Sequence, residues 1–190
     1  MATICQIGCG MIGKVMALDI SKRHDLHLSD LDRSALKEIK TLDPTIKTKC
    51  FNVNDSESLK SFVKPADIVL IAVPGHMGYK LLEKIIDFKK NIVDISFSPE
   101  NILSLNKKAK DNNITVVFDA GLAPGIPNFL LGNIDAKENV KSFKYFVGGL
   151  PKHPNPPYNY KAPFSPIDVI EEYTRPARIM KNGKVITKPA

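Results

Sequence analysis

Short apolar segments alternate with longer amphipathic segments over residues 1–120 of the chain. The apolar segments are rich in Ile and Val and mostly lack alternation with polar residues, which is typical of strands buried on both faces. The predicted strands, the last of them the weakest, are 2–7, 26–30, 67–73, 91–95, 114–119 and 46–51. The predicted helices are 11–23, 33–42, 55–63, 78–89 and 99–112. This alternation predicts an α/β fold, a doubly wound parallel sheet covered by helices.

Polar residues mark where several of these helices begin. Asp32 and Asp55 stand where a side-chain oxygen can accept from the first free N–H groups of a helix, so both are predicted N-caps. Ser98–Pro99 places a capping hydroxyl before a proline at the first helical position. Ser165–Asp168 repeats that arrangement and ends in the acid of a capping box.

The pattern changes after residue 120, where glycines and prolines end the alternation. The further predicted elements are a strand at 140–147, an extended proline-rich segment at 151–166, a helix at 166–173, and strands at 178–181 and 184–187. Asn182–Gly183 joins the last two strands and predicts a type I′ hairpin. We predict a domain boundary after residue 125, with an antiparallel α+β domain over 126–190. One strand and one hairpin make a poor independent core, so we expect this second domain to be incomplete.

Composition and charge argue against several classes of protein. The net charge is +7, but only four of the 27 basic residues are arginines and the lysines are scattered, which is unlike a nucleic-acid-binding stripe. No apolar run approaches the ~18 residues of a membrane span, and residues 2–7 lead into a glycine motif rather than a signal-peptide cleavage site. The three cysteines lack metal-ligand spacing. We expect a cytoplasmic protein with free thiols and no metal, nucleic-acid or membrane partner.

Residues Gly8–Gly13 (GCGMIG) follow the pattern G-x-G-x-x-G between the first predicted strand and helix. This is the context of a Rossmann dinucleotide-binding turn. Gly8 allows a tight turn, Gly10 lets the backbone approach a pyrophosphate, and Gly13 lets the helix pack closely on the strand, while the helix start attracts phosphates. The predicted cofactor-binding residues of the turn are Gly8, Gly10, Met11, Ile12 and Gly13. We therefore predict an NAD(P)-binding Rossmann domain over 1–125.

An acid at the end of the second predicted strand completes this fingerprint. The carboxylate of Asp30 can accept from both ribose hydroxyls and repels a 2′-phosphate, which favours NAD over NADP. Asp32 competes for this role, although its spacing suits an N-cap better. Arg33 could accommodate a 2′-phosphate, so NADP stays possible.

The loops after three predicted strands are expected to line one cleft, because ligands of open parallel sheets bind beyond the carboxyl ends of the strands. The further predicted cofactor contacts are Pro74, Gly75, Ser96, Gly121 and Pro124. Three titratable residues of these loops are catalytic candidates. His76 is a general acid or base, or else a loop histidine facing solvent. Asp94 and Asp119 each orient a substrate ammonium group or cap a following helix.

Polar side chains of the second domain suggest a substrate site. Two of the four arginines lie three residues apart and could hold a carboxylate bidentately, or they could pair with Glu171 and Glu172. The predicted substrate-binding residues are Tyr160, Tyr173, Arg175 and Arg178, and Lys161 is a fourth catalytic candidate.

Six stretches that together span nearly the whole chain carry a family resemblance. They are Gly8–Gly13, Pro74–Gly78, Val93–Asn101, Phe118–Gly125, Val147–Pro157 and Glu171–Lys184. On these blocks the chain resembles the saccharopine dehydrogenase-like oxidoreductases, and it is most similar to their lysine 6-dehydrogenase members. The resemblance implies a Rossmann domain and an α+β substrate domain, an NAD or NADP cofactor and a small amino-acid substrate. Family members are much longer, which implies that most of the substrate domain lies outside this sequence.

The resemblance also implies a reaction, the oxidative deamination of lysine at its ε-carbon. Hydride would pass to the nicotinamide, and water would hydrolyse the resulting imine to a semialdehyde and ammonia. Arg175 or Arg178 would then anchor the substrate carboxylate, and one of the four catalytic candidates would be the base. Two alternatives stay open: a saccharopine dehydrogenase or related carboxyamine reductase, and a non-catalytic dinucleotide-binding module. The edge of the predicted hairpin favours a homodimer in the full-length protein.

Overall fold

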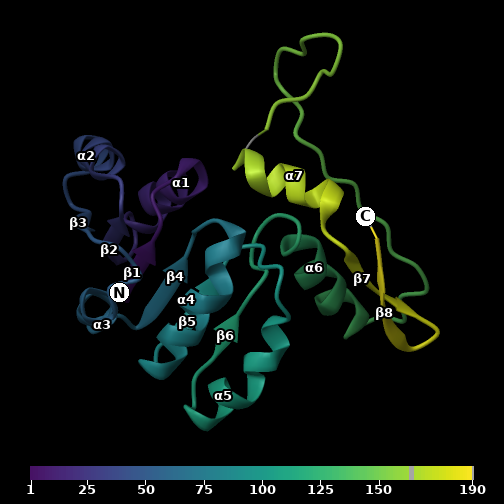
Figure 1. The fold of residues 1–190 in the computed structure, drawn as a ribbon, viewed down its shortest axis with the longest axis horizontal. Coiled ribbons are helices and arrows are strands. Elements are labelled where there is room, and N and C mark those ends of the chain that lie inside the picture. Colours follow the sequence, from purple (N-terminus) through teal and green to yellow (C-terminus); the bar gives the residue numbers. More distant parts are fainter. Residues whose placement is uncertain (163–164, 190) are drawn as a thin grey trace. The chain divides into compact units, whose positions relative to one another are not determined.

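Six parallel strands form one sheet in the computed structural model, which describes residues 1–162 and 165–189. The strands are β1 (Thr3–Ile7), β2 (Asp25–Asp30), β3 (Lys47–Cys50), β4 (Ile68–Ile71), β5 (Asn91–Asp94) and β6 (Val116–Val117). Their order is β3-β2-β1-β4-β5-β6, the order of a Rossmann sheet (Figure 1). The predicted doubly wound α/β fold is confirmed, including the weakest of its predicted strands.

Helices cover both faces of this sheet (Figure 1). They are α1 (Met11–Ile20), α2 (Arg33–Leu42), α3 (Ser56–Val63), α4 (Gly75–Asp87), the 3-10 turn η1 (Ile102–Leu105) and α5 (Asn106–Asp111). Side chains alternate between the faces along β1. Ile4 packs in one apolar cluster with residues of α1 and α2, whereas Cys5 and Ile7 pack in a second cluster with residues of α3 and α4. Two cores therefore hold the central strand, and the first residues after it, in a fixed position.

Two of the predicted helix caps are confirmed and two are wrong. Asp32 accepts from the N–H of Ser34, and Asp55 accepts from the N–H groups that follow it. No helix begins at Ser98–Pro99; the Ser98 hydroxyl instead donates inward to the carbonyl of Gly75, and the next turn begins at Ile102. Ser165 precedes helix α7 (Pro166–Thr174), but its side chain makes no capping hydrogen bond in the described structure, so the capping box is wrong.

Residues 126–147 differ from the prediction. Helix α6 (Ile126–Asp135) lies where no element was predicted. Pro127 does not interrupt this helix, because it stands in the first turn, where a proline costs no hydrogen bond. The strand predicted at 140–147 is wrong, since those residues form neither strand nor helix. Alternating polar and apolar side chains indicate that a segment could bury one of its faces. A strand also needs a neighbouring strand that hydrogen-bonds to its backbone N–H and C=O groups.

The chain divides into two compact units, Met1–Phe143 and Lys144–Ala190. The second unit contains α7 and an antiparallel hairpin of β7 (Ala177–Lys181) and β8 (Lys184–Lys188). Asn182 and Gly183 both have positive φ, 52° and 74°, which confirms the predicted type I′ turn. The proline-rich segment is irregular over its described residues, and 163–164 lie outside them. A domain boundary after residue 125 stays a prediction.

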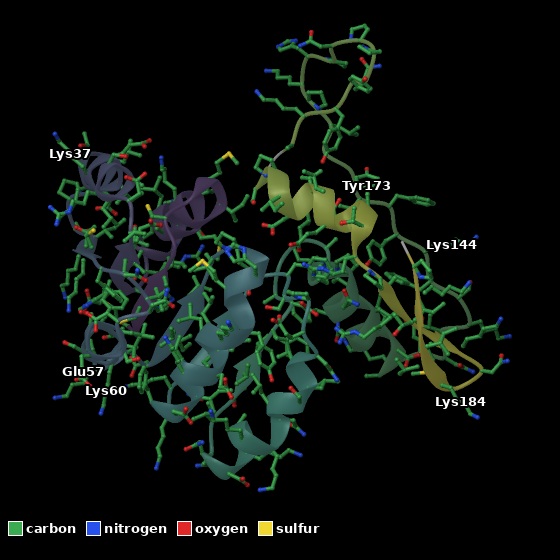
Figure 2. The ribbon with its side chains drawn as sticks, viewed as in Figure 1. Lys37, Glu57, Lys60, Lys144, Tyr173 and Lys184 are labelled. Atoms are coloured by element: carbon green, nitrogen blue, oxygen red, sulfur yellow. The ribbon has the colours of Figure 1, made fainter. Side chains whose placement is uncertain are left out.

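Lysines lie on different elements of both units: Lys37 on α2 and Lys60 on α3 belong to the first unit, and Lys184 on β8 belongs to the second (Figure 2). Among the described residues, no helix has the length and apolar character needed to cross a membrane.

Candidate functional site

Two glycines of the Gly8–Gly13 turn are required by close backbone contacts. Gly8 has a φ of +107°, and a Cβ there would lie 2.1 Å from the carbonyl oxygen of Ala72. A Cβ at Gly13 would lie 2.4 Å from the carbonyl oxygen of Gly8. A Cβ at Gly10, by contrast, would meet no atom of the described residues within 4 Å. The turn is thus packed at both ends and open in its middle, where a ligand can approach the backbone.

The start of α1 faces this open side. Its N-cap is Gly10, so no side chain caps the helix, and its first turn contains no acidic residue. The first N–H groups of an α-helix have no partner within the helix, and the helix dipole adds partial positive charge. Met11 and Ile12 are both exposed beside these groups. The arrangement is suited to a phosphate or another anion.

Asp30 connects β2 to the glycine turn. One carboxylate oxygen accepts from the N–H of Cys9 at 2.6 Å, and the other accepts from the N–H of Asp32 at 2.8 Å. Each oxygen retains a further lone pair that a ribose hydroxyl could use. Asp32 is occupied as the N-cap of α2, as its spacing predicted. The role of Asp30 in binding a ribose stays a prediction.

Cys9 itself contributes only its backbone to this site. Its thiol is buried beside the carbonyl of Ala35 on α2. Burial, and secondarily the charge of Asp30, raise the pKa of Cys9 to about 11.

Gln6 is a site residue that sequence analysis missed. Its side chain is fully buried in β1, and Nε2 donates to the carbonyl of Gly8 at 2.8 Å and to that of Gly13 at 2.7 Å. One amide group therefore joins the two ends of the turn. The only signal in the sequence is a polar residue within an apolar strand next to the glycine motif.

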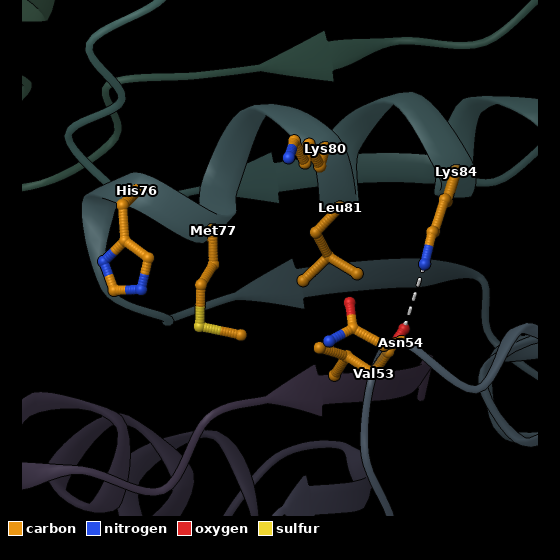
Figure 3. A pocket seen from close by; sticks show the side chains of 7 residues that line it. All are labelled: Val53, Asn54, His76, Met77, Lys80, Leu81 and Lys84. Carbon is orange, nitrogen blue, oxygen red and sulfur yellow. Dashed lines mark hydrogen bonds between the residues drawn. The ribbon is translucent and has the colours of Figure 1, made fainter.

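The loop after β4 lies directly against the turn, because Ala72 contacts Gly8. Pro74 is the N-cap of α4, and Gly75 is its first residue. Beyond them a cavity of about 300 Å³ lies between α4 and the loop that follows β3. Its lining residues are Val53, Asn54, His76, Met77, Lys80, Leu81 and Lys84. Figure 3 shows Met77 and Leu81 pointing from α4 toward Val53, while Lys84 donates to the Val53 carbonyl.

The loop after β5 is folded inward rather than toward solvent. Asp94, Ser96 and Ser98 are all buried, and Asp94 is only 1% exposed. The N–H of Ser96 donates to Asp94 at 2.8 Å, but the second carboxylate oxygen has no hydrogen-bond partner among the described residues. Burial raises the pKa of Asp94 to about 6, although Ser96 lowers it. Gly78 of α4 lies over this loop, and a Cβ there would be 2.0 Å from the Ser96 hydroxyl.

The loop after β6 is tight. Asp119 has a φ of +50°, and its negative charge is a lesser cause of the raised pKa of Asp94. The N–H of Ala120 donates to the carbonyl of Asp94. Gly121 and Gly125 lie so close that a Cβ on Gly125 would be 1.9 Å from the Gly121 carbonyl oxygen. Pro124 lies within this loop, so the residues predicted here are brought together at the same sheet edge as the glycine turn.

The substrate-binding and catalytic candidates of the second unit are mostly exposed. Arg175 forms an ion pair with Glu171, which agrees with the simpler of the two interpretations of that arginine. Arg178 is an exposed residue of β7, and Tyr160, Lys161 and Tyr173 are exposed as well. Figure 2 shows Tyr173 on α7. Their roles in substrate binding stay predictions.

The sheet order, the glycine turn at the head of α1 and the acid at the end of β2 define a Rossmann-type dinucleotide-binding domain. A family described as "Saccharopine dehydrogenase NADP binding domain" matches residues 4–117, and "Saccharopine dehydrogenase C-terminal domain" matches residues 121–190. The chain therefore belongs to the saccharopine dehydrogenase family, as the resemblance of its motifs implied.

Individual relatives agree with this assignment. An alpha-aminoadipic semialdehyde synthase of Arabidopsis thaliana is 34% identical over 142 residues, which cover 71% of this chain and 13% of that protein. A saccharopine dehydrogenase [NADP(+), L-glutamate-forming] of Pyricularia oryzae is 30% identical over 141 residues, which cover 70% of this chain and 31% of that protein. The chain thus spans less than a third of the length of either relative.

Solved structures share the fold. The apo saccharopine dehydrogenase (L-Glu forming) of Saccharomyces cerevisiae matches with a TM-score of 0.70 and 19% identity, over 100% of this chain and 44% of that one. GenD2 from gentamicin A biosynthesis, solved in complex with NAD, matches with a TM-score of 0.51 and 15% identity, over 62% of this chain and 34% of that one.

Proposed function

We propose that this chain forms the NAD(P)-binding part of an oxidoreductase that acts on the CH–NH group of an amino acid. The observation that carries the proposal is the uncapped start of α1, open at Gly10 and flanked by the Asp30 carboxylate. A diphosphate would accept from the free N–H groups, and the adjoining ribose would donate to Asp30. The bound nicotinamide would supply hydride acceptance, while the protein holds the reacting groups in place.

Asp30 favours NAD as the cofactor. A carboxylate at the ribose 2′ position accepts from a hydroxyl but repels a phosphate. The exposed Arg33 is the nearest feature in the sequence that would favour NADP, and the family name and the Pyricularia oryzae relative both mention NADP. We infer that NAD binds more tightly because Asp30 already contacts the turn, whereas Arg33 is an exposed residue at the start of α2.

The relatives support saccharopine as the substrate, and the motif resemblance supports lysine. The chemistry is shared: a hydride leaves the carbon bonded to nitrogen, the nitrogen loses a proton, and water hydrolyses the imine to an aldehyde and an amine. Lysine would release ammonia, whereas saccharopine would release a second amino acid.

Of the four catalytic candidates, we favour His76, Asp119 or Lys161 as the base for this reaction. Asp94 is a weaker candidate because its buried carboxyl lacks access to a substrate, which favours a supporting role. His76 is exposed and follows the loop that touches the glycine turn. The lysines beside it raise the local positive potential, which attracts an anionic dinucleotide.

Calorimetric titration of the chain with NAD and with NADP tests the proposal, with Gly10→Glu as the variant. A glutamate side chain would fill the open space at Gly10 and repel a diphosphate, so binding should be lost while the far-ultraviolet circular dichroism is retained. Undiminished affinity in the variant would place the cofactor elsewhere. Formation of reduced nicotinamide with saccharopine, and separately with lysine, identifies the substrate, and binding without either activity would support a binding module.

A further inference from the structure

We propose that Gln6 is a positioning residue for dinucleotide binding, which holds the Gly8–Gly13 turn in its diphosphate-binding conformation through two hydrogen bonds. The proposal rests on the proposed function of the turn and adds to it a residue outside the glycine motif. Gln6 reaches both ends of the turn from one position in β1, the central strand of the sheet.

The orientation of the Gln6 amide follows from its neighbours. Two carbonyl oxygens, of Gly8 and Gly13, face the same atom at 2.8 and 2.7 Å, so that atom must be the nitrogen with its two donors. The amide oxygen has no hydrogen-bond partner among the described residues and is buried. A buried unpaired acceptor costs free energy, and an apolar side chain would avoid that cost in the apolar cluster that contains Ile4. The two hydrogen bonds that the amide donates therefore explain why a polar side chain occupies this buried position.

These two bonds act on the conformation of the turn. The Gly8 carbonyl is drawn inward under the helix, and the Gly13 carbonyl is drawn toward the strand, which fixes the start of α1 against β1. The N–H of Cys9 belongs to the same peptide group as the Gly8 carbonyl and donates to Asp30, so both ends of this peptide are held. With the backbone held at Gly8, Cys9 and Gly13, the open N–H groups around Gly10 keep one direction before any ligand binds. Preorganisation of this kind raises affinity, because no binding free energy is used to order the turn.

The expected loss of affinity follows from the fraction of molecules whose turn is in the binding-competent conformation. If loss of the two bonds leaves the binding-competent turn populated about one tenth of the time, the apparent dissociation constant rises about tenfold. Two ordinary hydrogen bonds are sufficient for a shift of that size.

The test compares Gln6→Met with Ile4→Met in the 190-residue chain. Methionine has nearly the length and volume of glutamine but no donors. Ile4 lies two residues earlier on the same face of β1, so its variant perturbs the same core without touching the turn. Gln6→Leu serves as a second variant if Gln6→Met does not fold. Thermal unfolding is measured for all of them.

The readouts are the affinity for NAD by calorimetry and the affinity for adenosine by NMR titration. We expect Gln6→Met to weaken NAD binding about tenfold or more while adenosine binding, which needs no diphosphate contact, changes less than about twofold. Ile4→Met should leave both affinities unchanged even if its melting temperature falls. A general loss of structure would instead weaken both ligands in both variants.

Three results would overturn the proposal. NAD affinity in Gln6→Met within about twofold of the unmodified chain would show that dinucleotide binding does not depend on the two Gln6 hydrogen bonds. An equal loss for NAD and adenosine would show a structural role alone. If the unmodified chain binds neither NAD nor NADP, the proposed function fails as well, so the two failures are distinguishable.

Discussion

Replacement of Asp94 by asparagine tests whether a buried carboxyl sets the pH dependence of folding. In the folded chain the pKa of Asp94 is raised from 3.8 to about 6, mainly by burial. Each pKa unit corresponds to about 1.4 kcal/mol, so the folded state binds this proton about 3 kcal/mol more strongly than the unfolded state does. The proton-linked stability is fully present below about pH 4 and is lost as the pH rises through about 6.

Asparagine keeps an oxygen for the N–H of Ser96 but does not titrate. The free energy of unfolding of the unmodified chain, minus that of Asp94→Asn, should therefore fall by about 2 to 3 kcal/mol between about pH 4 and about pH 8. Urea unfolding at several pH values measures this difference, with Asp135→Asn, at an exposed position on α6, as the control. A difference that stays constant to within about 1 kcal/mol would refute the reasoning, because the carboxyl would then titrate as it does in the unfolded chain.

Three further predictions concern packing and cofactor choice. Gly78→Ala places a methyl group 2.0 Å from the Ser96 hydroxyl and should lower the unfolding free energy by about 1 to 3 kcal/mol, with partial recovery when Ser96→Ala is added. Denaturant titration of the unmodified chain, the single variant and the double variant measures both effects. Leu82→Ala removes a fully buried side chain of α4 and should cost about 2 to 5 kcal/mol in the same assay, whereas a cost under about 1 kcal/mol would contradict its place in the core. Asp30→Ser should lower the ratio of NAD to NADP affinity about tenfold or more by calorimetry, and an unchanged ratio would separate Asp30 from the ribose.

The sheet could be predicted from the sequence because its central strands are buried on both faces. Apolar runs such as 67–73 contain β4, and the glycine motif between a strand and a helix located α1. Asp32 and Asp55 were predictable as caps because their oxygens need only the next few N–H groups of the chain. Interactions between residues that are close together in the sequence can therefore be predicted from a short segment of it.

The errors concern interactions between distant segments. The inward direction of Ser98 depends on Gly75, which is 23 residues away, so a Ser-Pro pair alone suggested a helix start. The burial of Asp94 likewise depends on α4 above it, whereas the sequence shows only its position at a strand end. Gln6 was missed because its partners lie on a turn whose usual description mentions only glycines.

The buried thiol of Cys9 has a consequence for the chemistry that the turn tolerates. Oxidants and alkylating reagents attack the thiolate form of cysteine, and a pKa of about 11 leaves almost none of it at neutral pH. Cys50, which is only partly buried at the end of β3, is the better target. A sulfur atom can therefore stand in the middle of the glycine turn without making the turn sensitive to peroxide.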